Sequence, residues 1–265
     1  MASESPAQPM LEARCLVKRF YGHAVVDNVS FAVHRGEVVG YLGPNGSGKT
    51  TTTRILTGLL EPTSGQILFD GRETRLDPLE FRRRLGYVPE EPHLYPFLSG
   101  RDYLELIGRL REMSPSVMNR KVRALLQLFG LADAAEQAIG SYSKGMKQKT
   151  LVIAALLHDP DVLVFDEPDS GLDVTTALVV RHLIANLAAR GKAILYTSHI
   201  LDVVERLCTR VIVLHQGRVV ADDSVANLRS VLASASLEEV FAHLVLRQDP
   251  NRIAGDIADV VTGDA

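Results

Sequence analysis

One eight-residue segment restricts the fold of this chain more than any other feature: Gly43-Pro-Asn-Gly-Ser-Gly-Lys-Thr50. It matches the pattern G-x-x-x-x-G-K-[ST] at every defined position. The largely apolar residues 37–42 predict a buried strand directly before it, and residues 51–60 predict a helix directly after it. A glycine-rich loop between a strand and a helix is the context in which this pattern binds phosphate groups. The sequence therefore predicts a P-loop at residues 43–50.

The residue types in this loop suit a nucleotide with its metal ion. Glycines permit a tight turn whose backbone N–H groups point inward, and the helix N-terminus adds a partial positive charge. Lys49 supplies a full charge for the β and γ phosphates, and the Thr50 hydroxyl is a ligand for Mg²⁺. The predicted nucleotide-binding residues here are Gly43, Pro44, Asn45, Gly46, Ser47, Gly48, Lys49, Thr50 and Thr51.

A second apolar strand is predicted at residues 162–165, and it ends in two acids, Asp166 and Glu167. The end of this strand is expected beside the P-loop. Asp166 is then placed to hold Mg²⁺ through a water, and Glu167 to accept a proton from an attacking water. Alone the pattern is weak, because acids often follow buried strands where the chain reaches the surface. Combined with a P-loop it predicts nucleotide hydrolysis.

A third segment, Ser141-Tyr-Ser-Lys-Gly-Met-Lys-Gln148, precedes the acidic strand. Ser143 is a suitable N-cap for the helix that follows. A capping serine, a glycine and a free helix N-terminus together form a second candidate anion site. Taken by itself, the segment is better explained as an ordinary capped helix; the P-loop elsewhere in the chain favours the anion site.

Strand patterns recur along the chain with helical patterns between them, which predicts a parallel sheet covered by helices. Residues 11–33 show alternating apolar positions typical of antiparallel strands, whereas residues 92–157 show only helical spacing. The chain has 265 residues with 46% hydrophobic and 23% charged, which is globular composition. The expected fold is α/β: a parallel core with an N-terminal antiparallel subdomain and an inserted helical subdomain.

The composition also excludes several classes of function. A net charge of −3 gives no support for nucleic-acid binding, which usually shows a basic footprint. The longest apolar run, residues 151–157, is far shorter than the ~20 residues that a membrane span requires. Two cysteines, Cys15 and Cys208, are too few for a disulfide framework.

Taken together, these segments resemble the ATP-binding subunit of an ABC transporter. The resemblance covers residues 11–246, with residues 1–10 expected as a disordered tail and 247–265 as a loose polar tail. It implies the RecA-like P-loop NTPase fold, ATP and Mg²⁺ as cofactors, and Glu167 as the catalytic base. His199 resembles the family's switch histidine, which contacts the γ-phosphate, and Tyr21 resembles the aromatic residue that stacks on adenine.

The resemblance also implies a site shared between two chains. The family's signature, Leu-Ser-Gly-Gly-Gln, reads Tyr142-Ser-Lys-Gly-Met146 here, and Asp173 ends the D-loop sequence Ser170-Gly-Leu-Asp173. The expected contacts to the ATP of the opposite chain are Ser143, Lys144, Gly145, Met146 and Asp173. A second departure is Glu90, which stands where the family usually has glutamine; with Thr50 and Asp166 it completes the expected metal ligands.

The variant signature, the Glu90 loop and Leu237-Glu-Glu-Val-Phe241 resemble the branch that is paired with ABC-2-type permeases, which include drug, antibiotic and sodium efflux systems. The implied function is an ATP-hydrolysing subunit that dimerises, as a homodimer or heterodimer, around two ATP molecules. It powers an integral membrane permease on a separate chain, at the cytoplasmic face of the membrane. Two alternatives stay open: a soluble ABC ATPase in cofactor assembly, and a nucleotide-sensing module without transport.

Overall fold

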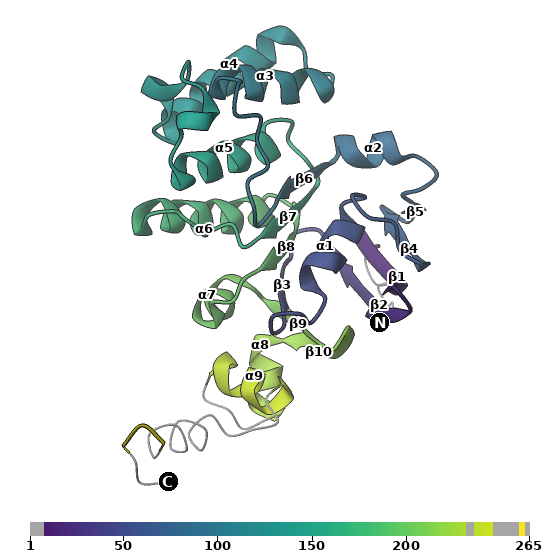
Figure 1. The fold of residues 1–265 in the computed structure, drawn as a ribbon. Helices are drawn as coiled ribbons and strands as arrows, with labels where there is room; N and C mark the ends of the chain where they lie inside the picture. Colours follow the sequence, from purple (N-terminus) through teal and green to yellow (C-terminus); the bar gives the residue numbers. More distant parts are fainter. Residues whose placement is uncertain (1–7, 232–235, 246–259, 263–265) are drawn as a thin grey trace, which may run out of the picture.

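Two β-sheets and the helices around them make up the chain, of which the computed structural model describes residues 8–231, 236–245 and 260–262 (Figure 1). The tail predicted at residues 1–10 lies outside the described residues up to residue 7, and the tail predicted at 247–265 lies outside them except for 260–262. Met10 is buried, and its N–H donates to Val33 O at 2.9 Å, so ordered pairing begins just before the first strand.

The first sheet is antiparallel, with strand order β2-β1-β4-β5. Its strands are β1 Leu11–Phe20, β2 His23–Val33, β4 Ser64–Phe69 and β5 Arg72–Glu73. The turn between β1 and β2 consists of Tyr21 and Gly22, both with positive φ, as the tightest hairpin connections require. Leu11 and Ala13 of β1 and Val29, Phe31 and Val33 of β2 are buried at alternate positions, and the antiparallel pairing of the two strands is confirmed. The alternation breaks at Cys15, which is exposed and has φ +49°, so Leu16 is the next buried residue of β1.

The second sheet is the core, with strand order β10-β9-β3-β8-β7-β6. Its strands are β3 Val38–Leu42, β6 Leu85–Val88, β7 Val162–Asp166, β8 Ala193–Thr197, β9 Arg210–His215 and β10 Arg218–Ser224. All neighbours are parallel except β9 and β10. Every residue of β3, β7 and β8 is buried, because helices pack on one face of this sheet, and the first sheet together with the helix at residues 49–56 packs on the other. The α/β P-loop fold expected from the sequence is thus confirmed.

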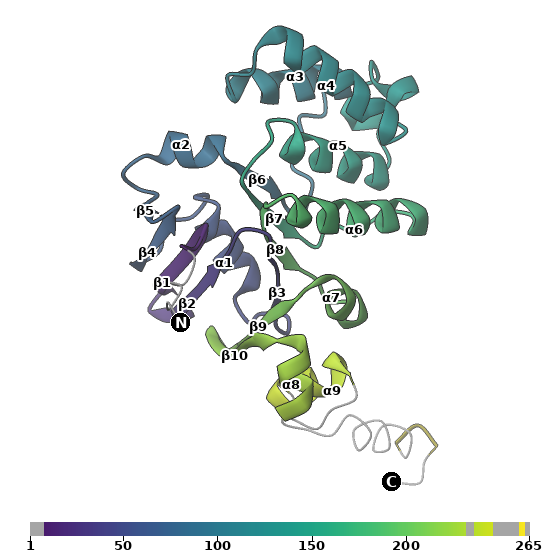
Figure 2. The same cartoon turned by 180° about the vertical axis from the view of Figure 1, so that it is seen from behind.

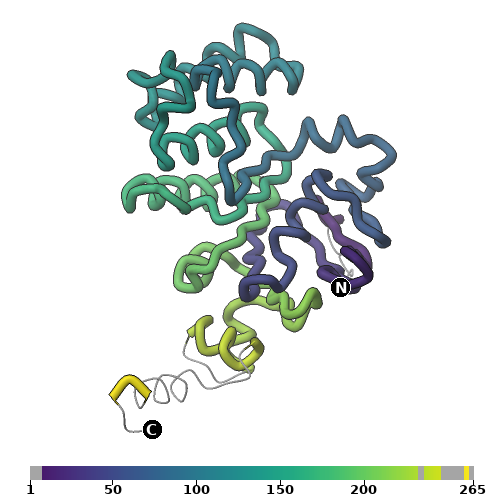
Figure 3. The backbone as a smooth tube through the Cα atoms, viewed as in Figure 1, coloured from purple at the N-terminus to yellow at the C-terminus, as the bar shows by residue number. Residues whose placement is uncertain are grey.

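Nine α-helices surround the sheets in the described part of the chain. They are α1 Lys49–Leu56, α2 Pro78–Arg83, α3 Gly100–Leu110, α4 Pro115–Leu128, α5 Lys144–Leu156, α6 Val174–Ala189, α7 Leu201–Leu207, α8 Val225–Val231 and α9 Leu237–Val245. Between β6 and β7 every element is helical, including the short turns Ala132–Ala134 and Ile139–Ser141. The chain leaves the sheet after β6, passes through α3, α4 and α5 above α6, and returns to β7 (Figures 2 and 3).

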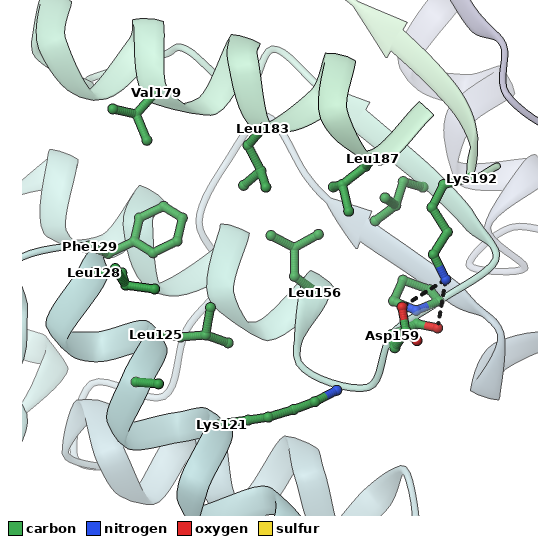
Figure 4. Close-up of a pocket in the computed structure, with 13 residues that line it drawn as sticks. Lys121, Leu125, Leu128, Phe129, Leu156, Asp159, Val179, Leu183, Leu187 and Lys192 are labelled. Carbon is green, nitrogen blue, oxygen red and sulfur yellow. Dashed lines mark hydrogen bonds and ion pairs between the residues drawn. The ribbon is translucent and has the colours of Figure 1, made fainter. Parts of the chain in front are cut away.

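An apolar groove of about 480 Å³ lies where these helices meet the core (Figure 4). Leu125 of α4, Leu156 of α5 and Leu183 of α6 are among its lining residues. At one end Lys192 Nζ lies 2.7 Å from Asp159 Oδ1. The groove therefore lies at the interface between the helical segment and the core of the protein.

The last helices attach to the core through α7. Glu205 of α7 accepts hydrogen bonds from Arg229 Nη1 of α8 at 2.7 Å and from Leu237 N at the start of α9 at 3.0 Å. Leu237 and Val240 are buried in the main core cluster, so α9 is packed and not a free amphipathic helix. Among the described helices, none has the length and apolar character needed to span a bilayer.

Candidate functional site: a phosphate pocket beside two strand-end carboxylates

The loop between β3 and α1 has backbone geometry that only glycine tolerates at its closest approaches. Gly48, the N-cap of α1, has φ +105°, and a Cβ there would lie 2.5 Å from Val25 O. A Cβ on Gly43 would lie 2.4 Å from both Leu214 O and Ser47 Oγ. These positions explain why the sequence places glycine at both ends of the pattern. The loop wraps the N-terminus of α1, as a phosphate site requires.

Lys49 lies over this loop. Its Nζ donates to Gly43 O at 2.7 Å and to Pro44 O at 3.2 Å. Burial lowers the pKa of Lys49, and the nearby carboxylates of Glu167, Asp166 and Glu90 oppose that shift. The ammonium is thus positioned beside the loop carbonyls and within the field of three acids, all of which are distant from Lys49 in the sequence.

A single pocket of about 400 Å³ contains these groups. Its lining residues are Val25, Asn45, Gly46, Gly48, Lys49, Thr50, Thr51, Glu90, Asp166 and Glu167. The structure therefore brings together the P-loop, the Glu90 loop after β6 and the end of β7. The parallel arrangement of β3 and β7 across β8 causes this meeting, because parallel strands end at the same edge of the sheet.

Asp166, the last residue of β7, is almost fully buried, at 2% exposure. Its Oδ2 accepts from Thr53 Oγ1 at 3.0 Å, and its Oδ1 accepts from Thr197 Oγ1 at 2.5 Å. The two hydroxyls fix the carboxylate between α1 and β8. Sequence reasoning missed both threonines; the only signals were the position of Thr53 one turn after Thr50 and that of Thr197 at a strand end.

Glu167 has a left-handed backbone, with φ +49°, which is uncommon for a residue with a side chain. Its N–H points to Thr197, 3.2 Å from the carbonyl oxygen and 3.1 Å from the hydroxyl oxygen. This conformation turns the side chain into the pocket. Burial raises the pKa of Glu167, while His199, whose Nδ1 lies 2.8 Å from Glu167 Oε2, opposes the shift. A raised pKa makes the carboxylate a better proton acceptor.

The residues expected to contact the opposite chain do not line this pocket. Ser143 caps α5, and its Oγ accepts from Met146 N at 3.2 Å. A Cβ on Gly145 would lie 2.8 Å from Gly171 O, so the signature packs directly on the D-loop. Asp173 caps α6 by accepting from Thr176 N at 2.9 Å. Hydrogen bonds from Thr176 lower the pKa of the Asp173 carboxyl.

Tyr21 also lies outside the pocket. It occupies the β1–β2 turn and is fully exposed. Val25, on the following strand, is the residue of this hairpin that reaches the P-loop. It lines the pocket, and its carbonyl oxygen leaves no room for a Cβ at position 48. A stacking role for Tyr21 stays a prediction.

The predicted metal ligands share the chemistry that Mg²⁺ prefers. Thr50, Glu90 and Asp166 offer only oxygen atoms, and all three line the one pocket. The described residues contain no group of three or more His, Cys, Asp or Glu side chains arranged around a common ion position. Mg²⁺ in nucleotide sites typically takes one or two carboxylates and fills its other positions with phosphate oxygens and waters. The residues present therefore fit a magnesium–nucleotide complex rather than an all-protein metal cage.

Comparison with known proteins agrees with this geometry. A family model described as "ABC transporter" matches residues 26–170. The ATP-binding protein NatA of Bacillus subtilis is 38% identical over 223 residues, which are 84% of this chain and 91% of NatA. Nod factor export ATP-binding protein I of Burkholderia lata is 40% identical over 217 residues, which are 82% of this chain and 71% of that protein.

Solved structures show the same likeness. The structure of an ATP-binding subunit of an ABC transporter has a TM-score of 0.84 at 34% identity and covers 89% of this chain and 99% of its own. An ATP-binding cassette solved as a dimer in a post-hydrolysis state with ADP and Pi has a TM-score of 0.75 at 25% identity, over 81% of this chain and 98% of its own. The strand-end acids beside the P-loop and these matches lead to one conclusion: the chain belongs to the ABC transporter family, as an ATP-hydrolysing, ATP-binding subunit.

Proposed function

We propose that this chain dimerises around two ATP molecules and powers an ABC-2-type export permease from the cytoplasmic face of the membrane. The observation that carries the proposal is the single pocket that joins Lys49 and Thr50 to Asp166 and Glu167. Export is supported by the relative from Burkholderia lata, whose name specifies Nod factor export. The variant signature around Lys144 and the Glu90 loop support the ABC-2 branch.

ATP binding follows from the charges that line the pocket. Backbone N–H groups of the P-loop and the N-terminus of α1 would face the phosphates, and Lys49 would neutralise the β and γ groups. Thr50 and Glu90 would ligate Mg²⁺, and Asp166 would hold one of its waters because both carboxylate oxygens already accept from threonines. When bound, Mg²⁺ supplies charge stabilisation on the phosphate oxygens.

Hydrolysis requires that a water lose a proton as it attacks the γ-phosphorus. Glu167 accepts that proton, the new bond forms between the water oxygen and phosphorus, and the bond to the ADP oxygen breaks. His199 orients Glu167 through its Nδ1–H, and its own ring is 77% exposed and free to meet the γ-phosphate. Glu167 thus accepts the proton, and His199 contacts the phosphate.

The position of α5 supports a site shared between two chains. The N-terminus of α5, with Ser143, lies outside the chain's own pocket and packs on Gly171. A second subunit placed head to tail would present this helix end to the γ-phosphate. Ser143, Lys144 and Gly145 then supply hydrogen bonds and positive charge to the nucleotide bound by the opposite P-loop.

Exposed apolar side chains on and just before α2, in the loop after Glu90 and at the end of α3 are proposed to face the permease. They are Leu76, Leu79, Tyr95, Phe97 and Leu110, each between 61% and 94% exposed. The ion pair between Arg83 and Glu112 joins α2 to the end of α3, so Leu79 and Leu110 belong to neighbouring elements. Because Tyr95 and Phe97 follow Glu90 in the same loop, binding of a permease here is coupled to the nucleotide pocket.

The test is fractionation of cells that express the full chain with or without the membrane protein encoded beside it. The chain is expected in the membrane fraction only when that protein is present. Leu79→Asp and Phe97→Asp should release it, whereas Leu128→Asp, at a comparably exposed leucine of α4 outside this surface, should not. A chain that stays in the supernatant with every candidate permease would overturn the transport assignment and favour a cofactor-assembly ATPase or a nucleotide sensor.

A further inference from the structure

The segment from Glu167 to Asp173 carries groups for both halves of the proposed dimer. Its first residue is the proposed base and its last belongs to the D-loop. Between them stands Asp169, whose carboxylate takes no part in phosphate or metal binding as described above. Its Oδ2 accepts from Arg181 Nε at 2.9 Å, Arg181 Nη2 at 2.7 Å and Tyr196 OH at 3.2 Å.

Asp169 and Tyr196 are both largely shielded from solvent. The Asp169 side chain is 10% exposed, and Tyr196 is fully buried. Burial, with Asp169 beside it, raises the pKa of the Tyr196 phenol, which therefore stays a donor. Asp169 Oδ1 is buried and has no hydrogen-bond partner within the described structure. A buried ion pair is rarely more stabilising than apolar residues of similar volume, and an unsatisfied oxygen adds a cost.

The elements that meet at Asp169 are those that hold the catalytic groups. Tyr196 lies in β8 directly before Thr197, which binds both Asp166 and the Glu167 N–H. Arg181 lies in α6, the helix that Asp173 caps. On the other side, Gln148 Nε2 of α5 donates to Pro168 O at 3.1 Å in a buried hydrogen bond. The segment is thus attached to α5, α6 and β8 within a few residues of the base.

We infer that Asp169 is a positioning residue for ATP hydrolysis: through Arg181 and Tyr196 it fixes the segment from Glu167 to Asp173, so that the base and the D-loop keep a defined relation. The inference rests on the proposed role of Glu167 as the base. Loss of Asp169 then displaces the base relative to the γ-phosphate without altering the P-loop, and a misplacement of about 1 Å can cost up to ~10²-fold in rate.

The experiment measures kcat, KM and ATP affinity of the purified full chain for Asp169→Ala, Asp169→Asn and Tyr196→Phe. Asp161→Ala is the matched control, because Asp161 forms an ion pair with Arg84 at 2.6 Å at the opposite end of β7. We expect Asp169→Ala to lower kcat by about tenfold or more and to leave the ATP dissociation constant within about twofold. Asp169→Asn keeps an acceptor oxygen, so its kcat should fall less than that of Asp169→Ala. Tyr196→Phe should lower kcat several-fold.

Asp161→Ala should lower the melting temperature as Asp169→Ala does and keep kcat within about twofold of wild type. A wild-type kcat in Asp169→Ala would overturn the inference. If that variant fails to fold, Tyr196→Phe, which removes one oxygen only, decides the question, and a wild-type kcat there overturns the inference equally. Glu167→Gln separates this inference from its premise: normal hydrolysis in Glu167→Gln refutes the base, whereas an inactive Glu167→Gln with a fully active Asp169→Ala refutes the positioning role alone.

Discussion

The imidazole Nδ1 of His199 lies 2.8 Å from the carboxylate Oε2 of Glu167. The two side chains differ sharply in exposure: that of His199 is 77% exposed and that of Glu167 is 14% exposed. The buried partner is suited to accept a proton, because burial raises its pKa. The exposed partner is suited to meet a phosphate that enters the pocket. We therefore expect the pair to link nucleotide binding to the orientation of the base.

Glu167→Gln should bind ATP and retain the fold, because the amide keeps the size of the side chain and the P-loop is untouched. Loss of a general base typically lowers the hydrolysis rate by ~10²–10⁴-fold. Phosphate release from the purified chain and binding of a fluorescent ATP analogue measure the two effects. Turnover within twofold of wild type would show that another group accepts the proton.

The same variant should dimerise with ATP, since removal of a negative charge stabilises the closed complex. Adding Ser143→Arg to it should prevent that dimer, because a long side chain then occupies the position offered to the opposite γ-phosphate. ATP binding to the monomer should be unchanged, as Ser143 lies outside the chain's own pocket. Size-exclusion chromatography with light scattering, with and without ATP, distinguishes these states. A double variant that still dimerises would exclude the proposed head-to-tail arrangement.

Lys49→Ala should weaken ATP binding by roughly tenfold or more, because a charged hydrogen bond to phosphate contributes about 1.5–3 kcal/mol. Isothermal titration calorimetry with Mg–ATP gives the dissociation constant. Lys192→Ala is the control, since Lys192 forms an ion pair with Asp159 at the apolar groove. Equal affinities for ATP in Lys49→Ala and wild type would contradict the P-loop assignment.

Glu90→Gln tests the acid that replaces the family's glutamine. If Glu90 ligates Mg²⁺ or orients the water, turnover changes while ATP affinity stays similar, because Glu90 borders the pocket without belonging to the P-loop. Glu91→Gln is the matched control: Glu91 is the adjacent acid in the sequence, and its side chain is 80% exposed. Steady-state hydrolysis at saturating Mg–ATP is the measurement. If Glu90→Gln and Glu91→Gln both have the kcat of the wild type, Glu90 is only a surface acid.

The environment of His158 leads us to expect that the stability of the folded chain depends on pH. Its Nε2–H donates to Leu85 O at 3.0 Å, and burial, reinforced by Arg111 and Lys121, lowers its pKa to about 4. Between about pH 6.5 and pH 4 the unfolded chain binds a proton that the folded chain does not, so stability falls as the pH is lowered through this window. The loss should reach about 3 kcal/mol by pH 4.

Urea unfolding between pH 4 and pH 7 measures this slope. His158→Gln should flatten it, whereas His93→Gln, at a histidine whose side chain is 77% exposed, should leave it unchanged. A slope that is the same in all three proteins would show that other groups control the acid sensitivity.

The phosphate site was predictable because its chemistry is encoded in short, contiguous segments. The P-loop has a fixed spacing, and its glycines occupy positions where a Cβ would strike Val25 O or Leu214 O. Asp166 and Glu167 follow an uninterrupted apolar strand, and parallel strands end at one edge of the sheet. From that regularity the acids could be placed beside Lys49, and the antiparallel and helical additions could be anticipated from the apolar alternation of residues 11–33 and the helical spacing of residues 92–157.

Contacts between distant segments were decided only by the tertiary structure. Thr53 and Thr197 fix Asp166 from two elements, and neither residue type distinguishes such a hydroxyl from an ordinary helix or strand position. Asp169, in the middle of a loop, gave no sign that it is buried against Arg181 and Tyr196. Local sequence determines which chemical groups are present and whether they lie on a helix, a strand or a loop. Which of them become partners depends on how β7, β8 and α6 pack, because that packing removes water and fixes the distances on which hydrogen bonds and charge interactions depend.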